Sequence, residues 1–172
     1  MGKKAIFLDR DGVINEDRSY VHSIEDFSFI PGVFEALREF AKMGYVLIIV
    51  TNQSGIGRGY YTLEDFMKLN EWMLKRFEEE GIEIAEVLFC PHAPDEGCEC
   101  RKPAPGMILE GIKKHNIDPD SSWMIGDKPT DMEAAIRAGV KGRILIGKNN
   151  SRGFAADSLY DTISIIKGLE RE

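Results

Sequence analysis

The stretch Lys4–Gly12, "KAIFLDRDG", decides the fold, because an apolar run there ends abruptly in two carboxylates and a glycine. The run "KAIFLD" is nearly continuous in apolar residues, as expected for a strand that a parallel sheet buries on both faces. Side chains alternate along extended backbone, so Asp9 and Asp11 begin on one side, and Gly12 permits a sharp turn. The stretch therefore predicts a buried strand with two carboxylates at its carboxyl end.

The rest of the chain repeats this pattern. Further strands are predicted by similar apolar runs at Tyr45–Thr51, Glu86–Cys90, Ser122–Asp127 and Gly142–Gly147, with a short edge strand at Asp157–Tyr160. Helices are predicted between them, at Gly32–Lys42, Thr62–Glu80, Pro105–His115, Thr130–Ala138 and Asp161–Leu169. Strands that alternate with helices indicate an α/β fold, a Rossmann-like three-layer sandwich around a mainly parallel sheet.

Composition and charge limit the kind of partner. The 172 residues fit one domain, and 43% apolar with 30% charged residues is typical of a globular protein. No apolar run approaches the ~20 residues that a membrane helix needs. A net charge of −7 argues against nucleic acid or anionic lipid as a partner. We expect a cytoplasmic monomer that acts on a small molecule.

Polar residues follow the predicted strands where each one ends. Asp9 and Asp11 end the first strand, Thr51 and Asn52 the second, and Asp127 a later one. Each pattern alone is common in turns and helix caps. Ligands of open α/β sheets, however, bind beyond the carboxyl ends of the strands. The coincidence of all these residues at strand ends therefore indicates one active site.

The two aspartates of "DRDG" suit complementary tasks. An ordinary aspartate, with a pKa near ~3.9, is already ionised at neutral pH, so Asp9 is expected to need no activation as a nucleophile. Asp11 needs the opposite, a raised pKa, in order to protonate a leaving alkoxide. This division of roles predicts nucleophilic catalysis by Asp9 with Asp11 as the general acid.

The predicted crevice is too acidic to hold a phosphate without cations. Four carboxylates are expected to meet there, those of Asp9, Asp11, Asp127 and Asp131. A hard divalent cation with oxygen ligands, Mg²⁺, is the ion that such a set favours. Lys102 would add a fixed positive charge and Thr51 a hydroxyl donor. The set predicts phosphoryl transfer to an aspartate.

These motifs carry a family resemblance. "DRDGVIN", the strand ending in Thr51, Lys102 and "GDKPTD" resemble the four motifs of the haloacid dehalogenase superfamily of aspartate-dependent phosphatases. Over essentially the whole chain, "FLDRDGVIN", "YVHSIEDFSFIPG", "VTNQSGIGRG", "CPH…CECRKPAPGM" and "GDKPTDMEAA" are similar to the D-glycero-D-manno-heptose 1,7-bisphosphate 7-phosphatase family. The phosphatase domain of histidinol phosphatases shares most of these features.

The resemblance implies a role for each matching residue. Asp9 would be the phosphorylated nucleophile, and Asp11 the general acid and later the base. Mg²⁺ would be held by Asp9, the backbone carbonyl of Asp11, and Asp127. Thr51 and Lys102 would stabilise the transferring phosphoryl group.

The resemblance also implies substrate contacts. They would come from Asp17, Arg18, Ser19, Tyr20, Asn52, Gln53, Ser54, Arg101 and Lys128. Asp131 is expected to orient its neighbours, Lys102 among them, rather than to bind metal. Arg101 and Lys128 offer positive charge for a second phosphate, which favours a sugar bisphosphate as substrate.

All three cysteines lie in one loop, residues 90–100, together with His92. A disulfide is disfavoured in a cytoplasmic protein and would leave one thiol over. Four nitrogen and sulfur ligands can instead make a closed tetrahedral Zn²⁺ site, and the resemblance supports Cys90, His92, Cys98 and Cys100 as its ligands. Only five residues separate His92 from Cys98, fewer than the family leads us to expect.

The gaps between motifs leave no room for a cap domain. Asp11 to Thr51 holds one predicted helix, and Asn52 to Lys102 holds one helix, one strand and the cysteine loop. We therefore expect residues 1–172 to form a single capless domain. Histidinol-phosphate phosphatase is the nearest alternative function. A non-catalytic zinc-stabilised module that binds phosphorylated ligands is disfavoured, because both Asp9 and Asp11 are present.

Overall fold

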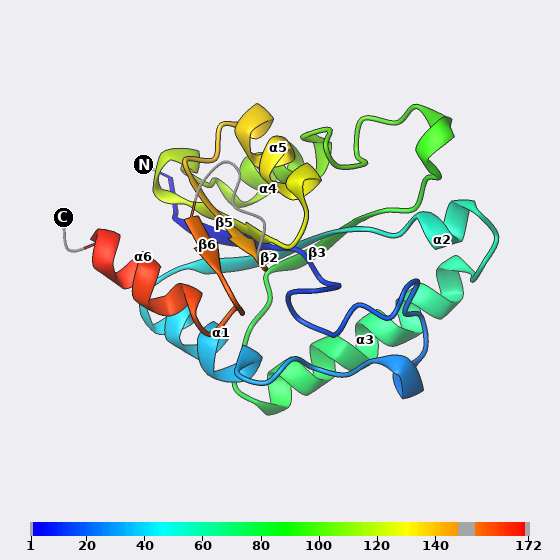
Figure 1. Ribbon diagram of the computed structural model, residues 1–172, viewed down its shortest axis with the longest axis horizontal. Helices are drawn as coiled ribbons and strands as arrows, with labels where there is room; N and C mark the ends of the chain where they lie inside the picture. Colours follow the sequence, from blue (N-terminus) through cyan, green and yellow to red (C-terminus); the bar gives the residue numbers. More distant parts are fainter. Residues whose placement is uncertain (1, 148–153, 171–172) are drawn as a thin grey trace.

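The computed structural model describes residues 2–147 and 154–170. At its centre lies a sheet in the order β3-β2-β1-β4-β5-β6, in which every pair of neighbouring strands runs parallel (Figure 1). The strands are β1 (Ala5–Leu8), β2 (Val46–Asn52), β3 (Glu86–Cys90), β4 (Trp123–Gly126), β5 (Gly142–Ile146) and β6 (Phe154–Ala156). The opening stretch thus forms a fully buried strand between β2 and β4, as predicted.

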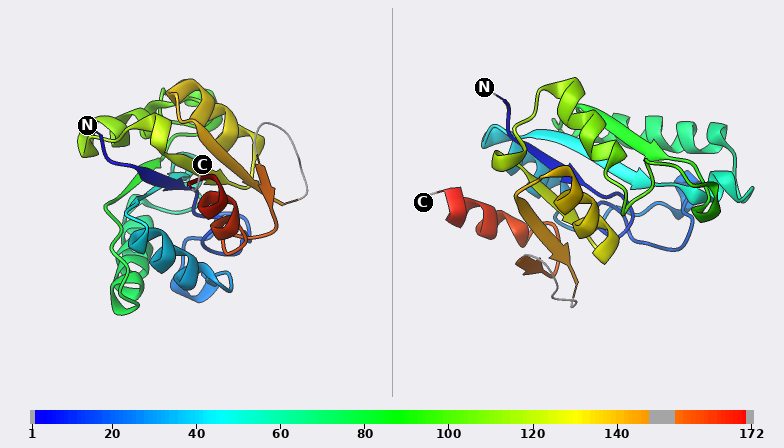
Figure 2. Two further views of the ribbon diagram at one scale, coloured as in Figure 1. Left: turned by 90° about the vertical axis from the view of Figure 1, so that its left-hand side faces the viewer. Right: turned by 90° about the horizontal axis from the view of Figure 1, so that it is seen from above.

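Helices cover both faces of the sheet (Figure 2). The α-helices are α1 (Val33–Lys42), α2 (Ser54–Gly57), α3 (Leu63–Glu79), α4 (Gly106–His115), α5 (Pro129–Ala138) and α6 (Thr162–Glu170). Short 3-10 helices are η1 (Ile24–Asp26), η2 (Pro94–Glu96) and η3 (Pro119–Ser121). Ile6 and Leu8 pack with apolar residues of α1, α3 and α6, whereas Ala5 and Phe7 pack with those of α4 and α5. The alternation of side chains along β1 therefore builds a three-layer sandwich, which confirms the predicted fold class.

Local signals in the sequence place the helix ends. Each of the five predicted helices agrees with the structure to within one residue at both ends. α3 begins with the capping box that its sequence suggests, in which Thr62 Oγ1 accepts from the backbone N–H of Asp65 and Asp65 Oδ2 accepts from that of Thr62, both at 3.0 Å.

The edge strand is the one element that the sequence misplaced. It forms at Phe154–Ala156 rather than at Asp157–Tyr160, which instead turns the chain into α6. The Ser158 hydroxyl donates to Asp161 Oδ2 at 3.0 Å, and the N–H of Asp161 donates to the carbonyl of Ser158 at 3.1 Å. Serine and aspartate favour such local hydrogen bonds over a strand ladder.

Among the described residues, no helix is both long and apolar enough to cross a membrane.

Candidate active site

The predicted nucleophile, Asp9, lies directly after β1 and is 7% exposed. Its Oδ1 accepts hydrogen bonds from Lys102 Nζ and from the backbone N–H of Arg10, both at 2.9 Å. The same ammonium lies 2.6 Å from Asp131 Oδ1 and donates to the carbonyl oxygen of Val50 at 3.0 Å. Lys102 therefore places one fixed positive charge against the candidate nucleophile.

Asp127, at the end of β4, completes a group of carboxylates. Ligand oxygens of Asp9, Asp127 and Asp131 all lie within 4.8 Å of one another. Asp131 is fully engaged, because its Oδ2 also accepts from the backbone N–H groups of Asp127 and Lys128 at 3.1 Å each. Asp127 Oδ1, by contrast, is buried and lacks a hydrogen-bond partner in the described part of the chain. A buried, unsatisfied carboxylate oxygen beside Asp9 fits a divalent cation with oxygen ligands.

Gly12 makes this arrangement possible. Its φ is +90°, a backbone conformation that residues with a side chain rarely adopt. A Cβ at this position would lie 2.1 Å from Asp127 Oδ2. The sharp turn predicted after "DRD" is therefore also the point where the loop after β1 meets the carboxylate of β4.

The protonation of Asp9 differs from expectation. Burial raises the pKa of Asp9 well above its usual range, and Asp131, Asp127 and Asp11 raise it further, whereas Lys102 lowers it. Asp9 is therefore not an ordinary aspartate in the chain without metal. Burial also raises the pKa of Asp127. Burial alone would lower the pKa of Lys102, but Asp131 and Asp9 raise it, so Lys102 stays charged.

The charge balance explains why a cation fits here. When all are ionised, three carboxylates and one ammonium in this group carry a net charge of −2 (−3 plus +1). One divalent cation neutralises that charge and favours the ionised form of Asp9.

Asp11, the candidate acid and base, is held by three neighbours. Its Oδ1 accepts from Arg10 Nη2 and Asn15 Nδ2, both at 2.9 Å, and its Oδ2 lies 3.4 Å from the donor Gln53 Nε2. Arg10 is only 1% exposed and also donates to the carbonyl oxygen of Val21 at 2.8 Å. The carboxylate therefore has a defined position on the floor of the site.

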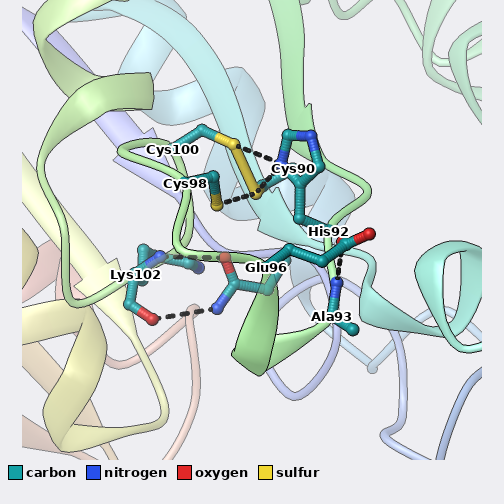
Figure 3. The surroundings of a disulfide bond; sticks show 8 residues. Cys90, His92, Ala93, Glu96, Cys98, Cys100 and Lys102 are labelled. Carbon is teal, nitrogen blue, oxygen red and sulfur yellow. Dashed lines mark hydrogen bonds between the residues drawn. A yellow bond between two sulfur atoms is a disulfide. The ribbon is translucent and has the colours of Figure 1, made fainter.

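The end of β2 contributes Thr51 and Asn52. Thr51 is fully buried, and its Oγ1 accepts from Gln53 Nε2 at 2.9 Å. The Asn52 amide binds the backbone of Lys102, accepting from its N–H at 3.0 Å and donating to its carbonyl at 3.3 Å (dashed lines at Lys102 in Figure 3). The structure thus brings the ends of β1, β2 and β4 together with Lys102 at one edge of the sheet.

A cavity of about 410 Å³ opens above these groups. Eight of the nine predicted substrate contacts line it, namely Asp17, Ser19, Tyr20, Asn52, Gln53, Ser54, Arg101 and Lys128. Arg18 does not, because it pairs with Glu16 at 2.8 Å on the surface. Arg101 Nη1 is buried and finds no hydrogen-bond acceptor within the described ranges. An unsatisfied guanidinium nitrogen at the rim fits an anionic ligand.

The four residues of the cysteine loop lie together, and two of them are bonded (Figure 3). Cys90 and Cys100 form a disulfide, and Cys98 keeps a free thiol. His92 Nδ1 lies 3.2 Å from Cys100 Sγ, and Cys98 Sγ lies 3.4 Å from Cys90 Sγ. We expected no disulfide. Zinc–sulfur bonds of about 2.3 Å at tetrahedral angles place sulfurs about 3.8 Å apart, so this crowded group also has the composition and nearly the spacing of a zinc site.

Comparison with known proteins decides the family. The D-glycero-beta-D-manno-heptose-1,7-bisphosphate 7-phosphatase of Pasteurella multocida is 44% identical over 183 residues, covering 98% of this chain and 99% of that protein. The D-glycero-alpha-D-manno-heptose-1,7-bisphosphate 7-phosphatase of Campylobacter jejuni is 48% identical over 153 residues, covering 89% and 88%. The chain belongs to the D-glycero-D-manno-heptose-1,7-bisphosphate 7-phosphatase family.

Structure and domain signatures agree with this heptose bisphosphatase family. The crystal structure of D,D-heptose 1,7-bisphosphate phosphatase from B. bronchiseptica, complexed with magnesium and phosphate, superposes with a TM-score of 0.86 at 28% identity and covers 98% of each chain. The family model for HAD-hydrolase-like proteins matches residues 99–159. The resemblance described above is thereby confirmed, and the chain is by family a phosphatase of the haloacid dehalogenase superfamily.

The sequence left two parts of this heptose bisphosphatase site unrecognised. Arg10 lies between two aspartates, and the alternation of side chains along the strand points it to the interior, where a charged group must be paired. The sequence could therefore have indicated a buried, paired arginine at this position. The hydroxyl of Tyr61 donates to Gln53 Oε1 at 2.5 Å. The sequence carries no signal for this contact, because Tyr61 lies eight positions after Gln53 in a loop without periodicity.

Proposed function

We propose that the chain is a Mg²⁺-dependent phosphatase that removes the 7-phosphate of D-glycero-D-manno-heptose 1,7-bisphosphate. The observation that carries the proposal is the placement of Asp9 against Lys102 and Asp127. Lys102 also lines the cavity, together with Asp11 and Arg101. Near full-length similarity to heptose bisphosphatases supports the choice of substrate.

In the first step, an oxygen of Asp9 attacks the phosphorus of the 7-phosphate. The bond between phosphorus and the sugar oxygen breaks, and Asp11 gives its proton to that oxygen, so the sugar leaves as an alcohol. Lys102 and Thr51 donate hydrogen bonds to phosphoryl oxygens as charge develops on them. In the second step, Asp11 removes a proton from a water that attacks phosphorus, and phosphate leaves Asp9.

Mg²⁺ would be held by Asp9, the backbone carbonyl of Asp11, and Asp127. When bound, it supplies positive charge to the phosphoryl oxygens and to Asp9. Asp131 has both carboxylate oxygens engaged by Lys102 and backbone N–H groups, which supports an orienting role for it.

The second phosphate has a candidate partner. Arg101 carries a buried guanidinium nitrogen without an acceptor in the described chain, and Lys128 lines the same cavity. Lys128 follows β4 and Arg101 precedes Lys102, so both would hold the 1-phosphate while the 7-phosphate meets Asp9. Asp17, Ser19 and Tyr20 would contact the sugar from the loop after β1.

We further propose that Cys90, His92, Cys98 and Cys100 hold a structural Zn²⁺ when all three thiols are reduced. Such an ion would have no open position for catalysis, and its use would be to order the loop that leads into Arg101 and Lys102. The order of elements supports a single capless domain, and we propose that it acts as a monomer.

The proposal is tested by comparing substrates on one preparation. We expect Mg²⁺-dependent release of phosphate from C7 of heptose 1,7-bisphosphate, with the position identified by ³¹P NMR. Both anomers should be compared, because relatives named for each are similarly identical. Histidinol phosphate is the competing substrate. Higher kcat/KM on histidinol phosphate, or release of the 1-phosphate, contradicts the proposal.

A further inference from the structure

Tyr61 is a buried tyrosine with a fixed position beside the active site. It is 6% exposed, and its hydroxyl donates to Gln53 Oε1 at 2.5 Å. Its ring stacks on His22, with centroids 4.7 Å apart and an angle of 4° between planes. On another side the ring meets Gly55, where a Cβ would lie 2.1 Å from Tyr61 Cε1. Glycine at position 55 therefore makes room for this ring.

Gln53 connects Tyr61 to two candidate catalytic groups. It is 3% exposed, and its Nε2 donates to Thr51 Oγ1 at 2.9 Å and lies 3.4 Å from Asp11 Oδ2. If the amide were reversed, its oxygen would face a carboxylate oxygen of Asp11, which is repulsive. The orientation of this amide is therefore important to both neighbours.

The Tyr61 hydroxyl selects one of the two orientations. Burial raises the pKa of Tyr61 to about 12, so the group keeps its proton at neutral pH. A protonated hydroxyl donates to Oε1 and thereby holds Nε2 towards Thr51 and Asp11. Among the described residues, Tyr61 is the one hydrogen-bond donor to Gln53 Oε1, so its loss would leave the amide oxygen without a partner.

The orientation of Gln53 sets the direction of the Thr51 hydroxyl. Because Thr51 Oγ1 accepts a hydrogen bond from Gln53, its own hydrogen points to a different oxygen. In this structure that oxygen is the carbonyl of Asn52, at a long 3.4 Å, and a closer acceptor can replace it. In phosphoryl transfer that closer acceptor belongs to the transferring group, where donors count most as charge develops.

We propose that Tyr61 is a positioning residue for phosphoryl transfer, which acts through Gln53 to aim the Thr51 hydroxyl at the phosphoryl group and to hold the Asp11 carboxylate. This inference rests on the proposed function, because Thr51 and Asp11 have these tasks only if the chain hydrolyses a phosphate ester. Tyr61 also lines the candidate substrate cavity, but its hydroxyl is engaged by Gln53, so its proposed effect on the reacting groups passes through that amide.

The test compares Tyr61→Phe with Tyr60→Phe. Tyr60 is the neighbouring tyrosine and is 58% exposed, so it is a matched control. In Tyr61→Phe we expect kcat on heptose 1,7-bisphosphate to fall about ten-fold while KM changes less than about two-fold, because the effect belongs to the transition state. Orthovanadate, which mimics the trigonal phosphoryl group, should inhibit Tyr61→Phe about ten-fold more weakly than it inhibits the unmodified protein. Inorganic phosphate should inhibit the two proteins about equally well. Tyr60→Phe should match the unmodified protein.

The route through Gln53 is tested in a second background. In Gln53→Leu, the added change Tyr61→Phe should cause no further loss of kcat, because the relay is already broken. An equal loss in both backgrounds overturns the proposal. A loss of kcat in Tyr61→Phe with unchanged vanadate inhibition also overturns it, because it would indicate a purely structural role. A fall in the Tm of Tyr61→Phe that accompanies the loss of kcat would indicate the same.

The outcome is separable from that of the proposed function. If the unmodified chain hydrolyses another phosphate ester, such as p-nitrophenyl phosphate, but no heptose bisphosphate, the proposed substrate is wrong. The same comparison of variants on that ester then still tests Tyr61.

Discussion

The side chain of Asn52 binds both polar backbone atoms of Lys102, accepting from its N–H at 3.0 Å and donating to its carbonyl at 3.3 Å. This pair of hydrogen bonds ties the end of β2 to the residue that follows the cysteine loop. Lys102 in turn reaches Asp9 at 2.9 Å. The position of this lysine is therefore set by β2 on one side and by the cysteine loop on the other.

Asn52→Ala should lower kcat about ten-fold, because the Lys102 backbone loses two partners and its ammonium is held less precisely against Asp9. Asn70→Ala is the control, since the side-chain oxygen of Asn70 on α3 is buried without a hydrogen-bond partner in the described structure. Steady-state kinetics separates the roles. A rise in KM alone would assign Asn52 to substrate binding instead.

Loss of zinc should weaken catalysis without preventing magnesium binding. The protein purified under reducing conditions is expected to contain one zinc per chain, and Cys98→Ser should lose it and part of its kcat, because the loop before Arg101 and Lys102 loosens. Metal analysis, thiol titration and magnesium binding check this. Zinc-free Cys98→Ser with full turnover would show that the loop does not need zinc to place Arg101 and Lys102.

Lys102→Met should destabilise the fold as well as stop catalysis. It leaves the buried carboxylates of Asp9 and Asp131 without their cation, and breaking a buried pair typically costs about 3–5 kcal/mol of unfolding free energy. Urea unfolding measures the loss. Adding Asp131→Asn should restore part of the stability but not the activity. Unchanged stability in Lys102→Met would contradict the charge balance drawn for this group.

The raised pKa of Asp9 predicts a pH dependence of stability in magnesium-free buffer. A carboxyl whose folded pKa is raised contributes stability that is present below its unfolded pKa of ~3.9 and is lost as pH rises through the folded value. Asp9→Asn has no carboxyl at this position and therefore does not lose stability in this way. The Tm of Asp9→Asn minus the Tm of the unmodified chain should therefore increase from pH 5 to pH 8. A difference in Tm that stays constant or falls over this range would indicate that burial does not disfavour the ionised form of Asp9.

Local patterns were enough to predict the fold because each element carries its own signal. Apolar runs such as Tyr45–Thr51 mark strands buried on both faces, and Thr62 with Asp65 marks the start of α3. The edge strand at Phe154–Ala156 was misplaced because an edge strand is half exposed and short, and packing rather than pattern sets its bounds.

Strand ends located the candidate catalytic residues such as Asp9, Thr51 and Asp127, since parallel strands bring their carboxyl ends to one edge. The residues of the substrate cavity were instead implied by the family resemblance. The protonation of Asp9 was not predictable in the same way, because its raised pKa depends on burial and on carboxylates from other strands. The contact of Tyr61 with Gln53 depends on how one loop packs, with Gly55 making room for the ring. Tertiary contacts of this kind leave no periodic trace in the sequence.

The central claim is that phosphate passes through Asp9. Heptose 1,7-bisphosphate labelled with ³²P at C7 can be mixed with the protein and Mg²⁺, quenched in acid within one turnover, and the peptides analysed by mass spectrometry. We expect the label on the peptide that contains Asp9, with no label and no turnover in Asp9→Asn. Hydrolysis of the 7-phosphate by Asp9→Asn, with no labelled aspartate at any time in the unmodified protein, would contradict the account.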